Sequence, residues 1–303
     1  MPKKVDVIIP IYKPDKKFNT LIKKILNDSY HVNKVIVLQT IEDDEKPNKS
    51  NNDRISVIPI KKRKFNHGIT RNIGVNASQA DVVVFMTQDV VIEEDDLIAK
   101  LISPMEHDNS VAISYAKQVP KKKADIIEAS IREFNYPNES IVKSSEDIEE
   151  MGIKTFFVSN SCAAYDITIF KKLGGFDNEI FAEDMMYAIK AINTGFKVVY
   201  NAKAQVIHSH SYTLKEQFKR NFDIGVLHKK HEVIFSKIKS ESEGMTMVRK
   251  ISVKLIKAHK FASIGSLILS SAAKFAGYRI GKLYEILPKK WILACTLNKD
   301  YFY

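Results

Sequence analysis

Apolar and polar residues alternate in blocks along the first part of the chain. Runs rich in valine and isoleucine, each bounded by polar residues, predict buried strands at 5–12, 34–40, 55–59 and 82–89. Apolar residues at helical spacing from Phe18 to Leu26, with lysines largely on the other side, predict an amphipathic helix. Pro10 is expected to turn the backbone out of the first strand. This order of elements predicts an α/β fold with a doubly wound sheet and a nucleotide site along one edge.

The fourth apolar run stops abruptly at a carboxylate, Asp89. Ligands of open α/β sheets bind beyond the carboxyl ends of the strands. Asp89 is therefore placed where a metal or a phosphate would be handled. A carboxylate at such a position also suits the cap of a following helix, and this alternative stays open.

Several short motifs occur in the order seen in family 2 glycosyltransferases, and over residues 5–210 the sequence resembles that family. The motifs are Ile9-Pro10-Ile11-Tyr12, Asn66-His67-Gly68 followed by Arg71-Asn72, Asp89, Gly174-Gly175-Phe176-Asp177, Glu183-Asp184 and His208-Ser209-His210. Residues 65–72 combined with Thr87-Gln88-Asp89 look most like the bacterial rhamnosyltransferase branch. The resemblance implies a GT-A fold, which is Rossmann-like and binds nucleotide-diphospho-sugars.

The resemblance also implies a set of residues that bind a nucleotide-sugar donor. These are Pro10, Tyr12, Gln39, Thr40, His67, Gly68, Arg71 and Gln88. Arg71 and Asn72 are expected to open a helix to about Ala77, whose first amides would suit a diphosphate. An exposed helical arginine is the alternative for Arg71. Gln39 and Thr40 can hydrogen-bond a pyrimidine edge, but they do not distinguish thymine from uracil.

Transfer from a sugar nucleotide releases a diphosphate, whose growing charge a divalent cation can stabilise. Asp89 resembles the surviving carboxylate of the family's metal-binding DxD motif, in which Thr87 replaces the first acid. The resemblance implies that His208, and then His210, assist it. Mg2+ needs only one carboxylate with phosphate and water oxygens, whereas Mn2+ also accepts imidazole. Alternatively, both histidines bond loop backbone at the end of a strand.

Inverting transfer also needs a base that takes the proton of the acceptor hydroxyl. The resemblance assigns this role to Asp184, with Glu183 orienting it or contacting the acceptor. A helical pattern follows the pair, so the alternative is that both acids merely stabilise a first helical turn.

Length and composition predict a catalytic domain at 1–215 and a helical extension at 216–303. The chain has 303 residues, is 45% hydrophobic and carries a net charge of +11. Its two cysteines form no disulfide framework or metal spacing, and the chain enters a strand without a signal sequence. A cytoplasmic location is therefore expected.

The positive charge concentrates near the carboxyl end, where Glu285 is the one carboxylate between Met245 and Lys290. Apolar residues recur there at spacings of three and four: Val248, Ile251, Leu255, Ala258 and Ala262. This pattern predicts a basic amphipathic helix on an anionic membrane surface. The apolar stretch 261–269 is too short to cross a membrane. The alternative is packing on the catalytic domain or on a second subunit, which leaves a homo-oligomer open. Nucleic-acid motifs are lacking, so no nucleic-acid partner is expected.

These observations predict an inverting, metal-assisted glycosyltransferase, peripheral on the inner face of the plasma membrane. The branch resemblance implies L-rhamnose from dTDP-L-rhamnose as the donor sugar, and a lipid-linked saccharide acceptor in bacterial surface polysaccharide synthesis. One alternative is transfer of another hexose from a UDP-sugar. The other is an inactive sugar-nucleotide-binding scaffold subunit.

Overall fold

The structure is a computed structural model that describes residues 2–48, 50–210, 212–238 and 241–303. Contacts divide the chain into two compact units. The first contains residues 1–119, 136–178 and 183–208, and the second contains 120–135, 179–182 and 209–303. The division into a catalytic domain at 1–215 and an extension at 216–303 concerns activity and stays a prediction.

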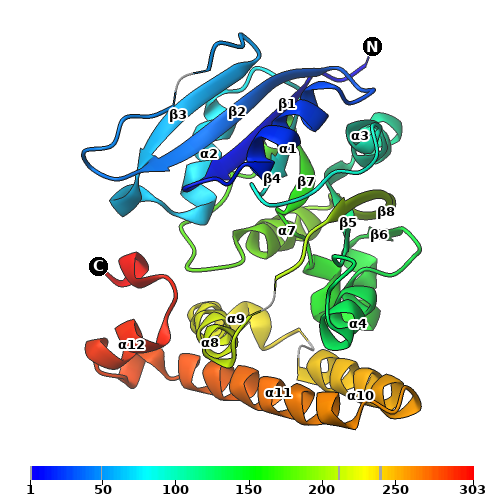
Figure 1. Ribbon diagram of the computed structural model, residues 1–303, viewed down its shortest axis with the longest axis vertical. Coiled ribbons are helices and arrows are strands. Elements are labelled where there is room, and N and C mark those ends of the chain that lie inside the picture. The colour runs from blue at the N-terminus through cyan, green and yellow to red at the C-terminus, as the bar shows by residue number, and fades with distance from the viewer. Residues whose placement is uncertain (1, 49, 211, 239–240) are drawn as a thin grey trace. The chain divides into compact units, whose positions relative to one another are not determined.

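The described residues of the first unit form an eight-stranded mixed sheet in the order β3-β2-β1-β4-β7-β5-β8-β6 (Figure 1). The strands are β1 (Val5–Ile11), β2 (Val32–Ile41), β3 (Ile55–Lys61), β4 (Val82–Met86), β5 (Val111–Val119), β6 (Ile141–Lys143), β7 (Cys162–Asp166) and β8 (Lys197–Ile207). The four strands predicted from sequence pair in parallel. Two strands not predicted, β7 and β6, run antiparallel to their neighbours.

Helices cover both faces of this sheet. They are α1 (Lys17–Leu26), α2 (His67–Ala77), α3 (Leu97–His107), α5 (Ile148–Met151), α6 (Ile167–Lys172) and α7 (Glu183–Asn193), with 3-10 turns η1 (Lys62–Lys64), η2 (Ser145–Asp147) and η3 (Gly152–Phe156). Val5, Val7 and Ile9 of β1 pack in the core that contains α1 and α3. Ile8, on the opposite face, meets α2 at Gly74. The two faces follow from the alternation of side chains along a strand.

Both prolines in the predicted strands stay inside the ladder. Pro10 pairs with Leu38, so the prediction that it turns the backbone out of β1 was wrong. Pairing of β1 with β4 stops at Ile8, and a residue without an N–H is tolerated beyond that point. Pro59 lies within β3, which is an edge strand of the sheet.

The second unit is helical. Its elements are α4 (Ile126–Asn135), α8 (Leu214–Lys230), α9 (Glu232–Phe235), α10 (Glu241–Lys257), α11 (Phe261–Gly281), η4 (Tyr284–Ile286), α12 (Lys289–Cys295) and η5 (Lys299–Phe302). Glycines let α8 and α11 approach closely: a Cβ on Gly277 would lie 2.1 Å from the Phe218 carbonyl oxygen. The segment after α12 is held against α8 by Asp223, which accepts hydrogen bonds from Thr296 and Asn298.

The apolar face predicted for 248–262 lies partly inside the second unit. Ile251 and Leu255 of α10 are buried in a cluster with Leu267 of α11, and α4 residues pack against them. Ala258 and Ala262 are exposed. The prediction that this face lies on a membrane was therefore wrong for its two central residues, because they form a small core among three helices.

Replacement of Gly277 by alanine should destabilise the second unit. The added Cβ meets the main chain of α8, which has to move, so we expect a loss of about 1–3 kcal/mol in urea denaturation followed by circular dichroism. Gly265→Ala on the same helix is the matched control, since a Cβ there meets nothing within 4 Å. The control should gain about 0.5–1 kcal/mol from helix propensity. Equal effects of both changes would contradict the close approach of the helices.

Candidate active site

The start of α2 is held by Asn66. Its side-chain oxygen accepts hydrogen bonds from the amides of Gly68 and Ile69, so α2 begins at His67 and not at Arg71 as predicted. This cap uses two of the first helical amides, which leaves fewer donors for an anion than the sequence suggested. At Gly68 a Cβ would lie 2.7 Å from the carbonyl oxygen of Asp177. Glycine therefore lets the helix start lie against the segment before α7.

That segment, Gly174-Gly175-Phe176-Asp177, connects α6 to the approach of α7. Gly174 and Gly175 adopt φ angles of +81° and +69°, which side chains disfavour. Asn72 holds the next residue, because its amide group donates to the carbonyl of Phe176 and accepts from its N–H. The motif thus fixes the chain that leads into α7 beside α2.

A buried ion pair joins the two helices. Arg71 Nη1 lies 2.8 Å from Glu183 Oε1, and the side chains are 5% and 8% exposed. Arg71 also donates to the carbonyl of His67, and Asn160 donates to the same Glu183 oxygen. Burial alone would raise the pKa of Glu183, but the nearby charges of Arg71 and His67 and the Asn160 hydrogen bond hold it below its usual value. Glu183 is therefore ionised.

Arg71 is not the exposed helical arginine that the sequence left as an alternative. Its guanidinium is engaged by Glu183 and by the start of its own helix, where it lies 5.9 Å from the centre of the Phe85 ring. Direct contact of Arg71 with a diphosphate stays a prediction.

Asp184, the next residue, is half-buried at the start of α7. Its carboxylate accepts hydrogen bonds from the main-chain N–H groups of Asn160 and Met185. Burial, followed by the charge of Glu183, raises the pKa of Asp184 to about 7. Adjacent carboxyl groups with pKa values driven apart are typical of acid–base sites, and a pKa near neutrality suits proton acceptance.

Asn160 was missed in the sequence analysis. It contacts Glu183 through its side chain and Asp184 through its main chain, and Tyr165 donates to its side-chain oxygen. A polar run, Ser159-Asn160-Ser161, directly before the buried strand β7 was the signal that could have revealed it.

Asp89 and His208 meet at the ends of β4 and β8. His208 Nε2 lies 3.5 Å from Asp89 Oδ2, and the imidazole is buried. Its Nδ1 lies 3.0 Å from Gln118 Oε1, and Gln118 Nε2 donates to Ser159 Oγ at 2.7 Å. Because the amide nitrogen donates to Ser159, its oxygen accepts from Nδ1, and in the neutral form of the ring Nε2 is then the nitrogen that can bind a metal.

His210 follows His208 by two residues. Asp89, His208 and His210 each offer one ligand atom, and these atoms lie within 4.8 Å of one another. The strand β8 ends at Ile207, so both rings lie just beyond its end. One carboxylate and two imidazoles form a donor set that Mn2+ accepts more readily than Mg2+. The hydrogen bond from Nδ1 to Gln118 is the support that metal-bound histidines usually have.

Tyr12 and Gln88 join the ends of β1 and β4. Gln88 accepts from the Tyr12 N–H and donates to its carbonyl. The Tyr12 hydroxyl donates to Glu42, and Lys62 contacts both of them. Glu42 and Lys62 were not predicted as site residues, because they follow β2 and β3 without a motif.

The two residues predicted to contact the base are buried. Gln39 accepts a hydrogen bond from the N–H of Asn48 and so holds the loop after β2. The Thr40 hydroxyl is buried without a hydrogen-bond partner among the described residues. Contact of either residue with a base stays a prediction, and Pro10 lies within β1 next to them, opposite Leu38.

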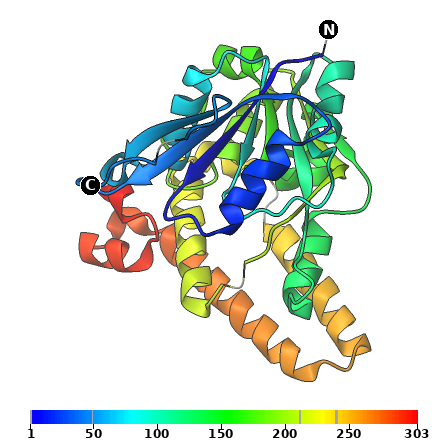
Figure 2. The ribbon, with the colours of Figure 1, turned by 45° about the horizontal axis from the view of Figure 1, so that its top comes forward.

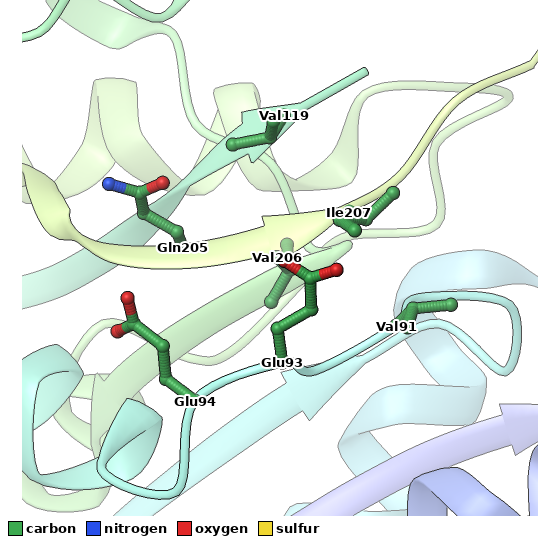
Figure 3. A pocket seen from close by; sticks show the side chains of 7 residues that line it. All are labelled: Val91, Glu93, Glu94, Val119, Gln205, Val206 and Ile207. Carbon is green, nitrogen blue, oxygen red and sulfur yellow. The ribbon is translucent and has the colours of Figure 1, made fainter. Parts of the chain in front are cut away.

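A small pocket lies between the segment after Asp89 and the ends of β5 and β8, lined by Val91, Glu93, Glu94, Val119, Gln205, Val206 and Ile207 (Figure 3). Its volume of about 60 Å³ is too small for a nucleotide sugar, and none of the predicted site residues lines it. At its edge Val91 and Ile207 exchange two hydrogen bonds of 2.9 Å. This bridge holds the segment after Asp89 against β8, and so keeps Asp89 beside His208.

Comparisons with known proteins give a family match and two similar relatives. Residues 6–174 match the family model for glycosyl transferase family 2. The chain is 38% identical to the O-antigen chain rhamnosyltransferase RfbN of Salmonella typhimurium, over 99% of this chain and 96% of that protein. It is 34% identical to the O-antigen chain rhamnosyltransferase WbaN of Salmonella anatum, over 98% and 95% of the two chains.

A solved structure shares the fold at low sequence identity. It is the mannosyltransferase PcManGT of Pyrobaculum calidifontis in complex with GDP-Man and Mn2+, which is 12% identical with a TM-score of 0.62. The similarity covers 95% of this chain and 89% of that one. The predicted α/β fold of GT-A type is confirmed.

Replacement of Arg71 by methionine should strongly destabilise the first unit. It leaves the buried Glu183 charge without its partner, so we expect a loss of about 3–5 kcal/mol in denaturant melts. The matched control is Lys190→Met, whose pair with Asp177 is partly exposed and should cost at most about 1 kcal/mol. Arg71→Met combined with Glu183→Gln should recover part of the loss. No recovery in the double variant would contradict an electrostatic origin.

Proposed function

The chain belongs to glycosyl transferase family 2, and from this we propose that it transfers L-rhamnose from dTDP-L-rhamnose to a lipid-linked saccharide in O-antigen synthesis, with inversion at the anomeric carbon. The two curated relatives, named as O-antigen chain rhamnosyltransferases, support the sugar and the type of polymer. Because a lipid-linked acceptor resides in a membrane, we further propose that the protein works at the inner face of the plasma membrane.

The observation that carries the proposal is the carboxyl pair at the start of α7. Asp184, with its pKa raised to about 7, accepts the proton of the acceptor hydroxyl as that oxygen attacks the anomeric carbon. The bond from the anomeric carbon to the nucleoside diphosphate breaks, and its electron pair leaves with the diphosphate. Glu183 stays ionised through Arg71, and its charge contributes to the raised pKa of Asp184.

We propose that Asp89, His208 and His210 hold a divalent cation, Mn2+ in preference to Mg2+. When bound, the cation neutralises charge that grows on the leaving diphosphate. Mn2+ in the solved mannosyltransferase and the three ligand atoms within 4.8 Å support this assignment. Gln118 positions His208 by fixing which ring nitrogen carries the proton.

For the donor, we propose that the nucleotide lies over the carboxyl ends of β1, β2 and β4, where Tyr12, Gln88 and the Thr40 hydroxyl are found. Glu42 and Lys62 line the same end beside Tyr12. The α2 cap at Asn66 leaves the cation as the main counter-charge to the diphosphate.

Asp184→Asn should abolish transfer while the protein stays folded. We expect a fall of about 10²–10⁴-fold in kcat, because asparagine cannot accept the proton. For the wild type, kcat/KM should fall about tenfold per pH unit below pH 7 and level off above it, since the base must be ionised.

The folded pKa of Asp184 lies above its unfolded value of 3.8, so its ionisation costs stability as the pH rises toward 7. The melting temperature of Asp184→Asn at pH 8 should therefore equal or exceed that of the wild type. Asp15→Asn, at an exposed position before α1, is the control. A variant at position 184 with normal turnover would exclude it as the base.

Calorimetric titration should show tighter binding of dTDP-L-rhamnose than of UDP-glucose, and only with Mn2+ or Mg2+ present.

Gln118→Leu should weaken Mn2+ binding about 10–100-fold, because His208 Nδ1 loses the hydrogen-bond acceptor that fixes the tautomer and orientation of the ring. Gln205→Leu, an exposed residue of β8, is the control. Tighter binding of the UDP-sugar would overturn the rhamnose assignment, and binding without turnover would favour a scaffold subunit.

A further inference from the structure

One side of α11 is apolar and exposed, in the second unit. Phe261, Ile268, Leu269 and Phe275 are each 58–65% exposed, and they follow one another along that side at helical spacing. The other side of the helix packs on α8 through its glycines. Figure 2 shows α11 as the long orange helix. We call these four residues the α11 stripe.

The neighbouring helix α10 has a similar outer side. Met245, Val253 and Ile256 are exposed, whereas Ile251 and Leu255 on its inner side are buried. Helices α10 and α11 therefore carry exposed apolar side chains in addition to those buried in the small core between them.

The two helices are rich in basic residues, some of which face inward: Lys254 pairs with Glu133 of α4, and Lys274 is largely buried. Between 246 and 284 the sequence has no aspartate or glutamate but eight basic residues: Arg249, Lys250, Lys254, Lys257, Lys260, Lys274, Arg279 and Lys282. Lys260 precedes Phe261, and the Arg279 guanidinium lies 5.9 Å from the centre of the Phe275 ring. The α11 stripe is thus bounded by a cation at each end.

We infer that the α11 stripe inserts into the headgroup region of an anionic lipid bilayer, with the helix parallel to the surface. Phe261, Ile268 and Phe275 would enter the apolar boundary, while lysine and arginine stems reach back to lipid phosphates. None of the helices in the described part of the chain has the length and hydropathy to cross a bilayer. The inference rests on the proposed function only for the identity of the membrane.

Charge complementarity favours lipid over a second copy of the chain. Lys254 is already paired with Glu133, but residues 246–284 contain no carboxylate, so two copies meeting through this surface would bring their remaining cations together. Anionic headgroups supply that compensation.

The test is flotation of the full-length protein with vesicles of phosphatidylcholine alone and of phosphatidylcholine mixed with phosphatidylglycerol. The wild type should float with the anionic vesicles, and less with the neutral ones. The triple variant Phe261→Ser, Ile268→Ser, Phe275→Ser should bind at least about tenfold more weakly. Its matched control is Val142→Ser with Val233→Ser, which are exposed but lie on other elements.

A second pair of variants isolates the charge. Lys257→Glu with Lys260→Glu should abolish the preference for anionic vesicles, whereas Lys16→Glu with Lys17→Glu, exposed residues at the start of α1, should retain it. Donor hydrolysis in solution should be unchanged in all these variants. If the wild type does not hydrolyse the donor at all, that result counts against the proposed function and not against lipid docking.

Several results would overturn the inference. These are failure of the wild type to float, normal flotation of the triple variant, or a dimer in light scattering that the triple variant breaks without any vesicle binding. Retention on RNA with no vesicle binding would assign the surface to nucleic acid instead.

Discussion

The buried pair of Arg71 and Glu183 is the interaction on which the candidate site depends. Two charges leave water together, which is favourable only because each has further partners, the His67 carbonyl and the Asn160 amide. The pair joins the first turns of α2 and α7, helices far apart in the sequence. It also keeps a negative charge next to Asp184, which contributes to the raised pKa of that residue.

The sequence predicted the parallel half of the sheet well, because strands such as β1 and β4 are continuous apolar runs. Prolines misled it: Pro10 lies beyond the β4 pairing and Pro59 on an edge strand, and only the assembled sheet shows either fact. The strands β5, β6 and β7 were missed, since their pairing depends on distant partners.

The fold brings together the acids and histidines that the motifs named, but the motifs did not predict which residues support them. Asp89 and His208 lie close together as expected. The helix α2 begins at His67, four residues before the predicted start, because Asn66 caps it. Asn160 and Gln118 act by contacting other side chains across the fold, and sequence spacing contains no information on such contacts. The buried side of α10 was misjudged for the same reason: amphipathic spacing reveals an apolar face, but not what covers it.

The tripeptide Ser159-Asn160-Ser161 connects two regions that the motifs treat as separate. Ser159 gives its single proton to Ser161 and so must accept from Gln118, which determines the tautomer of His208. Asn160, the next residue, holds both acids at the start of α7. If His208 and Asp184 have the roles proposed above, one short piece of backbone supports both the metal ligand and the base. A displacement of that backbone would then alter both the activation of the nucleophile and the departure of the leaving group.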